Sequence, residues 1–298
     1  MSANGQSATS LFKKKGEVAP PRRKLKVPYI FIFLCLLPWL SGLILFTAYP
    51  MVSSFYQSFT KFNIINPPEF IGLDNYRRMF FEDDDFMKAL KNTIWISVIS
   101  IPLRICFAIF TAWLLTRPKH GSKIYRTLFF IPSMVPAVAA TIVFTFVFNP
   151  IYGPINRTLE GVGIDNPPYW FLDPNWSKWG LILLGLWGIG DTMIIFLAGL
   201  LDVPKSLYEA AELEGASTWQ TFRYITLPLL TPVIFFSGVT GVIGSFQYFT
   251  QAFVASGQVN DYSKAMYFYA THIYEMAFKT YEMGYASALA WFLLLITL

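Results

Sequence analysis

The sequence predicts an all-α, polytopic membrane protein of about six transmembrane helices. Of its 298 residues, 54% are hydrophobic, 18% are aromatic and only 14% are charged, which is too apolar for an ordinary soluble domain. Six apolar runs alternate with polar segments, and basic residues are concentrated in the N-terminal tail and in the connection 117–126. Residues 1–26, which are rich in Ser, Pro, Gly, Lys and Arg, are expected to form a disordered tail that contacts anionic lipid head groups.

The apolar runs define a transmembrane domain over residues 27–298. They cover about residues 27–56, 92–116, 127–149, 179–201, 228–250 and 284–298. Each of the first five is long enough to cross about 30 Å of hydrocarbon at about 1.5 Å per residue. The first run is too long for the core of a signal peptide, so we expect it to be retained. The last run is too short to span, so we expect the natural chain to continue past Leu298.

Charge placement orients the spans. More than half of the 23 Lys and Arg residues lie in the N-terminal tail and in the connections 117–126 and 202–227. The segments 57–91, 150–178 and 251–283 carry more acidic than basic residues. By the positive-inside rule, the N-terminus and the 202–227 loop are expected in the cytoplasm. Topology therefore explains the basic net charge, and nucleic-acid binding is not indicated.

The first external segment and the two cysteines offer little chemistry. Asp74 is positioned to cap a short amphipathic helix, and the acidic run Glu82 to Asp85 is interpreted as a solvated surface cluster. Cys35 and Cys106 lie within apolar runs, so neither a disulfide framework nor a metal site is indicated.

The second and third spans contain helix-perturbing residues. Arg104 lies inside the second span, where a guanidinium costs about 2.5–3.5 kcal/mol, so it is expected to face protein or water or to snorkel toward the interface. Pro132 and Pro136 predict a kink in the first half of the third span. The connection 150–178 is interpreted as an irregular external loop.

The fourth span contains Asp191, an acidic residue in an apolar run. It follows Trp187 by four residues and is expected on the same helical face. An aromatic ring beside a carboxylate is suited to a sugar, through stacking and hydroxyl hydrogen bonds. The alternatives are an ion pair with Arg104 or with a neighbouring subunit. Glycines in this span predict close helix packing: Gly180, Gly185, Gly188 and Gly190.

The segment 206–228 is polar although it lies between two apolar runs. Ser206 with Glu209, and Ser217 with Gln220, each have the spacing of a helix capping box. Gly215 is suited to end the first of two short helices, and Pro228 to begin the next apolar run. The pattern predicts a cytoplasmic hairpin of two short helices. A segment that only connected two spans would not need this structure.

The spacing of this segment resembles the EAA signature of permease subunits in binding-protein-dependent ABC importers. The matching residues are Glu209, Ala210, Ala211, Gly215, Ile225, Leu227 and Pro228. The resemblance implies the type I importer permease fold and a coupling loop that sits in a cleft of an ATPase subunit. An ordinary capped amphipathic loop with solvated glutamates is the alternative.

Further stretches resemble the carbohydrate-uptake branch of that family, of the maltose, glycerol-3-phosphate and multiple-sugar type. They include Gly72 to Tyr76, Phe148 to Gly153 and Gly284 to Ala290. In the resembling permeases the segment matching Gly244 to Gln247 contributes to the translocation path. We therefore expect a substrate path that includes Trp187, Asp191, Gln247, Tyr248 and Phe249.

Catalytic machinery is not indicated. No Walker A pattern or ABC signature is found, and His120 and His272 fall in predicted loops without a nucleophile. The resemblance implies that ATP and Mg²⁺ bind partner ATPases and that this chain holds no cofactor. It also implies a bacterial or archaeal cell membrane, a second permease, two ATPase subunits and an extracytoplasmic binding protein that delivers a carbohydrate. A polyol phosphate substrate, an ion-driven secondary transporter and a membrane-embedded enzyme are the alternatives.

Overall fold

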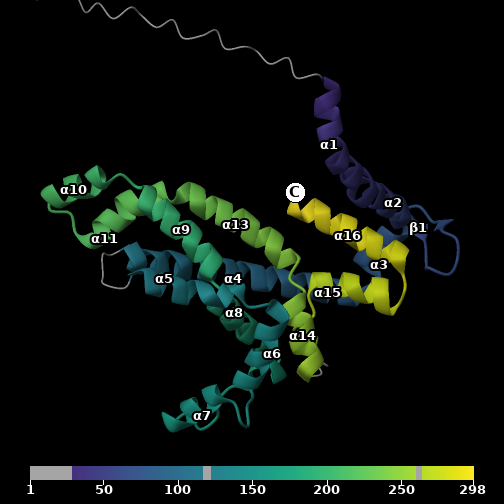
Figure 1. Cartoon of the computed structure of the whole chain (residues 1–298). Coiled ribbons are helices and arrows are strands. Elements are labelled where there is room, and N and C mark those ends of the chain that lie inside the picture. Colours follow the sequence, from purple (N-terminus) through teal and green to yellow (C-terminus); the bar gives the residue numbers. More distant parts are fainter. Residues whose placement is uncertain (1–28, 117–121, 260–263) are drawn as a thin grey trace, which may run out of the picture. The chain divides into compact units, whose positions relative to one another are not determined.

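The computed structural model describes residues 29–116, 122–259 and 264–298. The architecture is all-α, as the sequence predicts, apart from one hairpin of two-residue strands (Figure 1). The chain divides into two units, Met1–Met51 and Val52–Leu298. The expected tail 1–26 and His120 lie outside the described residues.

The described residues of the first unit belong to one apolar helix, which extends past the unit boundary at Met51. This helix comprises α1 (Tyr29–Leu43), a π-helical turn (Ile44–Ala48) and α2 (Tyr49–Ser58). Together they form a 30-residue helix of mean hydropathy 2.4, long enough to cross a bilayer. No residue of α1 is buried. Aliphatic and aromatic side chains thus surround α1, as expected for contact with lipid.

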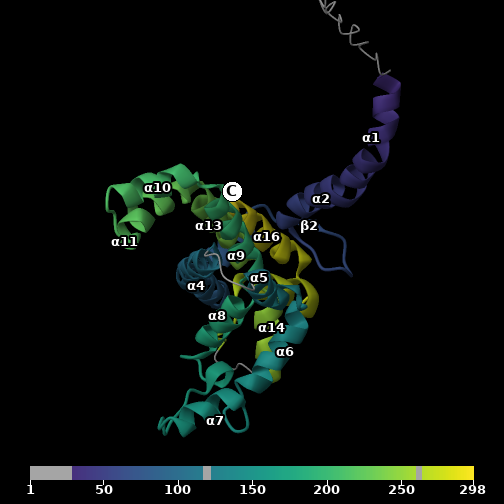
Figure 2. The same ribbon diagram turned by 60° about the vertical axis from the view of Figure 1, so that its left-hand side comes forward.

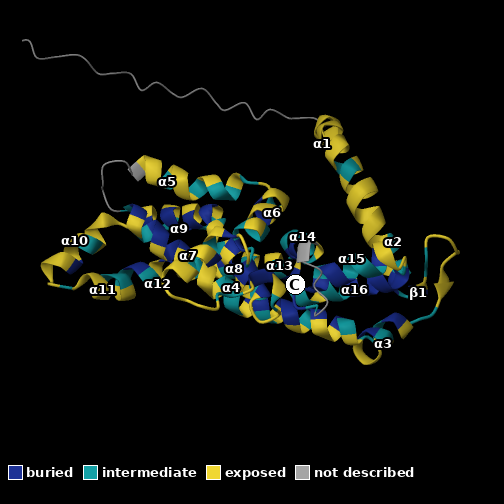
Figure 3. Ribbon diagram, turned by 90° about the horizontal axis from the view of Figure 1, so that it is seen from below, coloured by how far each residue is buried: buried dark blue, intermediate teal, exposed yellow. Residues whose placement is uncertain are grey.

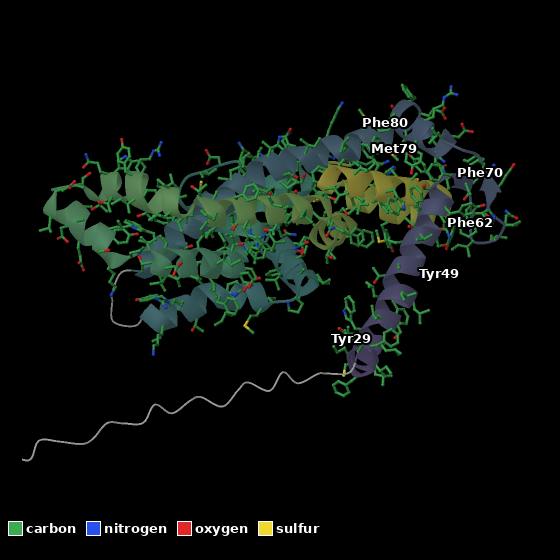
Figure 4. The ribbon with its side chains drawn as sticks, turned by 90° about the horizontal axis from the view of Figure 1, so that it is seen from above. Tyr29, Tyr49, Phe62, Phe70, Met79 and Phe80 are labelled. Atoms are coloured by element: carbon green, nitrogen blue, oxygen red, sulfur yellow. The ribbon has the colours of Figure 1, made fainter. Side chains whose placement is uncertain are left out.

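The second unit begins with a short hairpin and an amphipathic helix. The strands β1 (Thr60–Lys61) and β2 (Glu69–Phe70) pair antiparallel, with Thr60 opposite Phe70. The helix α3 spans Asp74–Phe81 and buries Met79 completely. Figure 4 labels Met79 and Phe80 on α3, next to α16 (Met283–Thr297). Asp74 lies in the first turn of α3 and makes no capping hydrogen bond, so the capping prediction is wrong.

The helix α4 (Asp84–Thr116) is the central element of the second unit. It has 33 residues and packs against α9, α13, α15 and α8 (Figure 1). Its buried side chains include many small residues, such as Ala89, Ala108 and Ala112. Inside a bilayer the hydrophobic effect does not drive helices together, and small side chains let neighbouring helices pack closely there.

Three apolar segments are bent helix pairs, and the first of them contains the kink predicted from Pro132 and Pro136. The helix α5 (Ser122–Phe130), with the 3₁₀ turn Ile131–Met134, meets α6 (Ala137–Val147) at 97°. The helix α8 (Ser177–Trp187) meets α9 (Gly190–Asp202) at 51°. The segment Thr218–Leu229 meets α13 (Thr231–Phe246) at 62°. The first bend follows Pro132 and Pro136, whose missing amides interrupt the helix.

The connections between the apolar segments are also largely helical. The 150–178 segment, expected as irregular, includes α7 (Pro154–Gly161) and the 3₁₀ turn Trp170–Leu172. The central loop forms α10 (Lys205–Leu213), α11 (Thr218–Thr221), a π-helical turn (Phe222–Thr226) and α12 (Leu227–Leu229). The segment after α13 contains α14 (Thr250–Val259), α15 (Tyr269–Tyr274) and a π-helical turn (Glu275–Lys279).

Three hydrophobic clusters hold the second unit together. The first contains Phe148, Trp170 and Phe268, which pack against residues of α8 and α14. The second lies between α4, α9 and α13 and contains Phe196 and Leu230, and the third fixes α3 and α15 to α16. Figure 3 shows buried residues concentrated on the inner helices, whereas α10 and α11 are largely exposed.

The start of α16 is seated against the hairpin. The Gly284 amide donates a hydrogen bond to the Phe62 carbonyl at 3.1 Å. A Cβ atom at position 284 would collide with the carbonyl oxygen of Thr60. Only glycine permits this approach of helix to strand.

Candidate functional site: a polar cavity and a helical hairpin

A cavity of about 420 Å³ lies beside the middle of α4. Its walls come from α4, from both sides of the α8–α9 bend, from α13 and from the segment that joins α13 to α14. That joining segment leaves helical geometry at Gln247, the residue that ends α13. Cavities of roughly 300–1,000 Å³ are typical of small-molecule sites, and broken helices line such sites in many transporters.

The lining of this cavity is rich in uncharged hydrogen-bonding groups. Hydroxyls and amides make up most of its polar side chains. The one charged side chain among its described lining residues is the guanidinium of Arg104. The polar lining residues are Ser100, Arg104, Thr192, Ser237, Thr240, Ser245, Gln247, Tyr248, Thr250 and Gln251. Apolar walls with a few fixed polar groups are the usual make-up of a site for a polar organic ligand.

Arg104 reaches across the cavity from α4 to α9. Its Nε donates a hydrogen bond to the Thr192 hydroxyl at 3.1 Å. Asp191 interacts with Arg104 electrostatically, but no ion pair joins them among the described residues. The direct Arg104–Asp191 pair considered from the sequence is therefore not formed.

The structure brings three of the five predicted path residues together. Gln247, Tyr248 and Phe249 all line the cavity. Trp187 and Asp191 do not: the Trp187 ring packs on Phe144 at 5.4 Å, and Asp191 is an exposed residue of the first turn of α9. The bend after Trp187 separates the two residues, so the shared helical face expected from their spacing does not exist.

Of the four glycines predicted to permit close helix packing in the fourth span, two have close neighbours. Positions Gly180 and Gly190 have no room for a Cβ, because Phe171 and the Phe129 backbone lie against them. Gly241 on α13 approaches Ile101 on α4, also within the cavity wall. Gly185 and Gly188 have no such close neighbour among the described residues.

The helical hairpin α10–α11 lies at one end of the second unit, away from α3 and the β-hairpin (Figures 1 and 2). Ser217 and Gln220 form a complete capping box, because each side chain bonds the other's backbone amide. The corresponding prediction for Ser206 and Glu209 is wrong: the N-cap is Pro204, two residues before Ser206, and α10 begins at Lys205. Pro228 likewise lies in the short α12, and α13 begins at Thr231.

Gly215 ends α10 in a left-handed conformation, with φ of 75°. Its amide donates to the Glu212 carbonyl at 3.0 Å, and the Ala216 amide donates to the Ala211 carbonyl at 2.9 Å. These two bonds form the Schellman motif that closes many helices. The turn expected at Gly215 is therefore formed, and it needs a residue that tolerates positive φ.

Contacts between its own elements hold the hairpin together. Tyr208 and Thr226 share a hydrogen bond at 3.1 Å, Ala211 is buried, and Trp219 stacks on Phe222 with ring centroids 5.8 Å apart. The remaining surface is exposed and partly apolar, including Leu213 at 90% and Trp219 at 69% exposure. An exposed apolar surface bordered by charges, here including Glu209, is typical of a protein-binding site.

A hydrogen-bonded cluster around the largely buried Asp83 carboxylate lies at the N-terminal end of α4. Asp83 accepts hydrogen bonds from the Tyr285 hydroxyl at 2.6 Å, from His272 Nε2 at 2.9 Å and from the Phe86 amide at 2.9 Å. The other ring nitrogen of His272 bonds the Tyr267 hydroxyl at 2.9 Å. The Asp83 side chain is only 12% exposed, so the expectation of a solvated cluster from Glu82 to Asp85 is wrong at this position.

The cluster shifts the titration of both partners. Burial raises the pKa of Asp83, but the hydrogen bonds from Tyr285, Phe86 and His272 outweigh it and hold that pKa below 3.8. Burial lowers the pKa of His272 below 6.5 despite the neighbouring carboxylate. At neutral pH the pair is therefore a carboxylate and a neutral imidazole. Within the described residues, no group of His, Cys, Asp and Glu could hold a metal ion.

Apolar spans, a polar cavity at helix bends and an exposed hairpin define a membrane transport protein. The chain belongs to the family of binding-protein-dependent transport system inner membrane components, whose model matches residues 104–298. It is therefore a permease subunit of the ABC importer class with the type I fold and several membrane-spanning helices.

Individual relatives and structures agree with this assignment. A probable ABC transporter permease of Bacillus subtilis, YesP, is 39% identical over 99% of this chain and 93% of its own length. The arabinooligosaccharide permease AraP of B. subtilis is 31% identical over 92% of this chain and 86% of that protein. The lactose permease LacF of Rhizobium radiobacter is 30% identical over 76% and 77%. A chain of a bacterial alginate ABC transporter shares the fold with a TM-score of 0.76, at 22% identity over 90% of both chains.

Proposed function

We propose that this permease imports a carbohydrate through the cavity beside α4. The observation that carries the proposal is the lining of that cavity, where hydroxyl and amide side chains alternate with apolar and aromatic groups. Such a surface pairs the hydroxyls of a sugar with neutral donors and acceptors and leaves ring faces to contact apolar walls. Relatives named for lactose and arabinooligosaccharide transport support the same substrate class.

The substrate path includes Gln247, Tyr248 and Phe249 in this proposal, with Trp187 and Asp191 near its border. The irregular segment after α13 presents Gln247 beside the two aromatic residues. A break of this kind lets backbone and side-chain groups meet a substrate at membrane depth. Trp187 and Asp191 flank the α8–α9 bend and would contact the substrate if the angle at that bend changed.

The hairpin α10–α11 is proposed to dock on an ATPase subunit in the cytoplasm. The basic residues of the N-terminal tail and of the connection 117–126 favour this orientation, with the N-terminus inside. Glu209, Ala210, Ala211 and Gly215 would form the docking helix and its turn. Ile225, Leu227 and Pro228 would carry its movement into α13. The chain itself would bind no cofactor, because ATP and Mg²⁺ would be held by the ATPases.

The complete importer is proposed to contain a second permease, two ATPase subunits and an extracytoplasmic binding protein. Closure of the ATPases on ATP would move the hairpin, and the bent helix pairs would change angle so that the cavity opens alternately to either side. A bacterial or archaeal cell membrane is the expected location.

The test is purification of the tagged chain from its native membranes, followed by identification of the bound subunits and by uptake in liposomes. The expected result is a complex with a second permease and an ABC ATPase, and saccharide uptake that requires ATP and the binding protein. Isolation without an ATPase, together with uptake driven by an ion gradient, would refute the proposal in favour of a secondary transporter.

A further inference from the structure

Arg104 supplies a full positive charge to a cavity whose other described lining residues are all uncharged. Arginine stays protonated under all physiological conditions. The residue belongs to α4, one of the long apolar helices, where an uncompensated guanidinium is costly. Such a residue needs either a water-filled cavity or an anion beside it.

The neighbouring groups of the chain do not neutralise Arg104 directly. Its Nε is engaged by the neutral hydroxyl of Thr192. No ion pair with Asp191, or with another described acidic residue, accompanies that bond. Asp191 contributes a longer-range attraction only. The two Nη groups therefore remain available for an acceptor inside the cavity.

A second observation also indicates unused hydrogen-bonding capacity. The Ser237 hydroxyl belongs to the cavity lining and has no hydrogen-bond partner among the described residues. A buried hydroxyl without a partner is unfavourable by about 1–3 kcal/mol. Rotation of this side chain toward a ligand would recover that energy, so the cavity is better satisfied when occupied.

We infer that Arg104 selects carbohydrate substrates that carry a carboxylate, such as oligosaccharides of uronic acids. The inference rests on the proposed import function and names its substrate class more narrowly. A guanidinium binds a carboxylate through two parallel hydrogen bonds, which are about twice as strong as neutral ones. The hydroxyl and amide groups around it then bind the sugar hydroxyls.

Charge matching favours a carboxylate over a phosphate ester. A phosphate monoester carries about −1.5 to −2 charges at pH 7. The described lining of this cavity offers one positive charge and no second cation. A monoanionic carboxylate is neutralised by that single charge, whereas a phosphate dianion would leave an uncompensated negative charge at membrane depth.

The experiment measures uptake by the reconstituted importer with its binding protein, in wild-type and Arg104→Gln forms. The probes are trigalacturonate, the same trisaccharide with its carboxyl groups reduced to alcohols, a panel of neutral oligosaccharides, and glycerol 3-phosphate. We expect Arg104→Gln to lower the transport efficiency for trigalacturonate about tenfold or more, because it loses charge-assisted hydrogen bonds. Uptake of neutral probes should stay within about twofold, and Arg104→Lys should recover part of the acidic uptake.

Thr240→Val is the matched control, because it removes a neutral hydroxyl from the same lining. It should affect acidic and neutral probes alike. Direct binding of labelled trigalacturonate to the solubilised complex, without the binding protein, separates selection by Arg104 from selection during delivery. Complex yield and monodispersity identify a variant that fails to fold, and Arg104→Lys then carries the comparison.

Three results would overturn the inference while the import function stands. In Arg104→Gln, uptake of acidic and neutral probes could fall equally, or neither could fall. The wild-type importer could also take up neutral sugars or glycerol 3-phosphate but not trigalacturonate. Absence of ATP-dependent uptake for every saccharide would instead contradict the proposed function itself.

Discussion

The imidazole of His272 lies 2.9 Å from the carboxylate of Asp83, although 189 positions separate them in the chain. Through this contact and the Tyr285 hydrogen bond, the start of α4 is joined to α15 and α16. The cluster is buried, so its protonation state is coupled to the stability of this end of the protein.

Acidification should therefore destabilise the protein in two stages. The pKa of His272 is below 6.5 in the folded state, so the unfolded state takes up a proton first as the pH falls through about 6.5. The pKa of Asp83 is below 3.8, so its contribution is present above that pH and is lost at lower pH. We expect the Tm of the detergent-solubilised protein to fall between pH 7 and pH 5. His272→Gln should flatten that decline, and an unchanged slope in this variant would contradict the prediction.

Asp83→Ala should destabilise the protein by about 2–4 kcal/mol, because it leaves buried donors unpaired and removes the N-terminal cap of α4. Asp83→Asn should cost less, since the amide oxygen still accepts from the Phe86 amide. Thermal unfolding of both variants at neutral pH measures the difference. Glu69→Ala, at an exposed strand position, serves as control and should leave the Tm unchanged.

Gly215→Val should abolish transport while the protein remains in the membrane. Position 215 has a φ of 75°, which costs a side-chain-bearing residue about 1–2 kcal/mol and is worst for a β-branched one. No described atom lies within 4 Å of a Cβ built there, so the effect would come from the backbone and not from crowding. Gly215→Asn tolerates this conformation and should retain uptake. Equal uptake by Gly215→Val and Gly215→Asn would show that the left-handed turn at position 215 is not the reason for any loss of transport.

Glu209→Lys should prevent coupling to the ATPase. Glu209 is exposed on α10, so charge reversal alters the docking surface and leaves the core intact. Glu214→Lys is the matched control, because it reverses a charge at the end of the same helix, where a cation is favourable. The measurement is ATP-dependent uptake alongside co-purification of the ATPase. Normal uptake by Glu209→Lys would refute the coupling role.

Gln247→Ala should raise the KM for uptake severalfold for acidic and neutral saccharides alike, because a neutral amide serves any hydroxyl. Val259→Ala, at the far end of α14, should leave the KM unchanged. Transport kinetics over a range of substrate concentrations provide the measurement. A change in the maximal rate alone would place Gln247 in the conformational step instead of in binding.

Hydropathy predicts where the apolar segments lie, but it does not predict where they bend. The stretch around Gly188 contains Gly185, Gly190 and Asp191, but the run as a whole is still apolar enough to be interpreted as one straight span across the bend that separates Trp187 from Asp191. The motif spacing of the hairpin was informative because capping is local, as at Ser217 and Gln220. The same spacing at Ser206 failed because Pro204, with its fixed φ, begins the helix earlier.

The structural features that could not be predicted from the sequence depend on contacts between segments that are far apart in the chain. The local pattern around Asp83 is that of a solvated acidic loop, and nothing near it in the chain indicates His272 or Tyr285. Arg104 was recognisable as an unusual residue, because a charge inside an apolar run is rare. Its place in the cavity beside Gln247 and Tyr248 depends on how α4, α9 and α13 pack.

The close fit of Gly284 on the hairpin has a consequence for the order of assembly. Thr60 and Phe62 are synthesised early, whereas Gly284 follows after most of the chain. At about 5–20 residues per second, translation of the intervening segment takes about ten seconds or more. Until then the Phe62 carbonyl lacks the amide that it accepts in the finished protein. This end of the permease is therefore completed only after Gly284 has been synthesised, and a ribosome that stalls before α16 would leave it open to quality-control proteases.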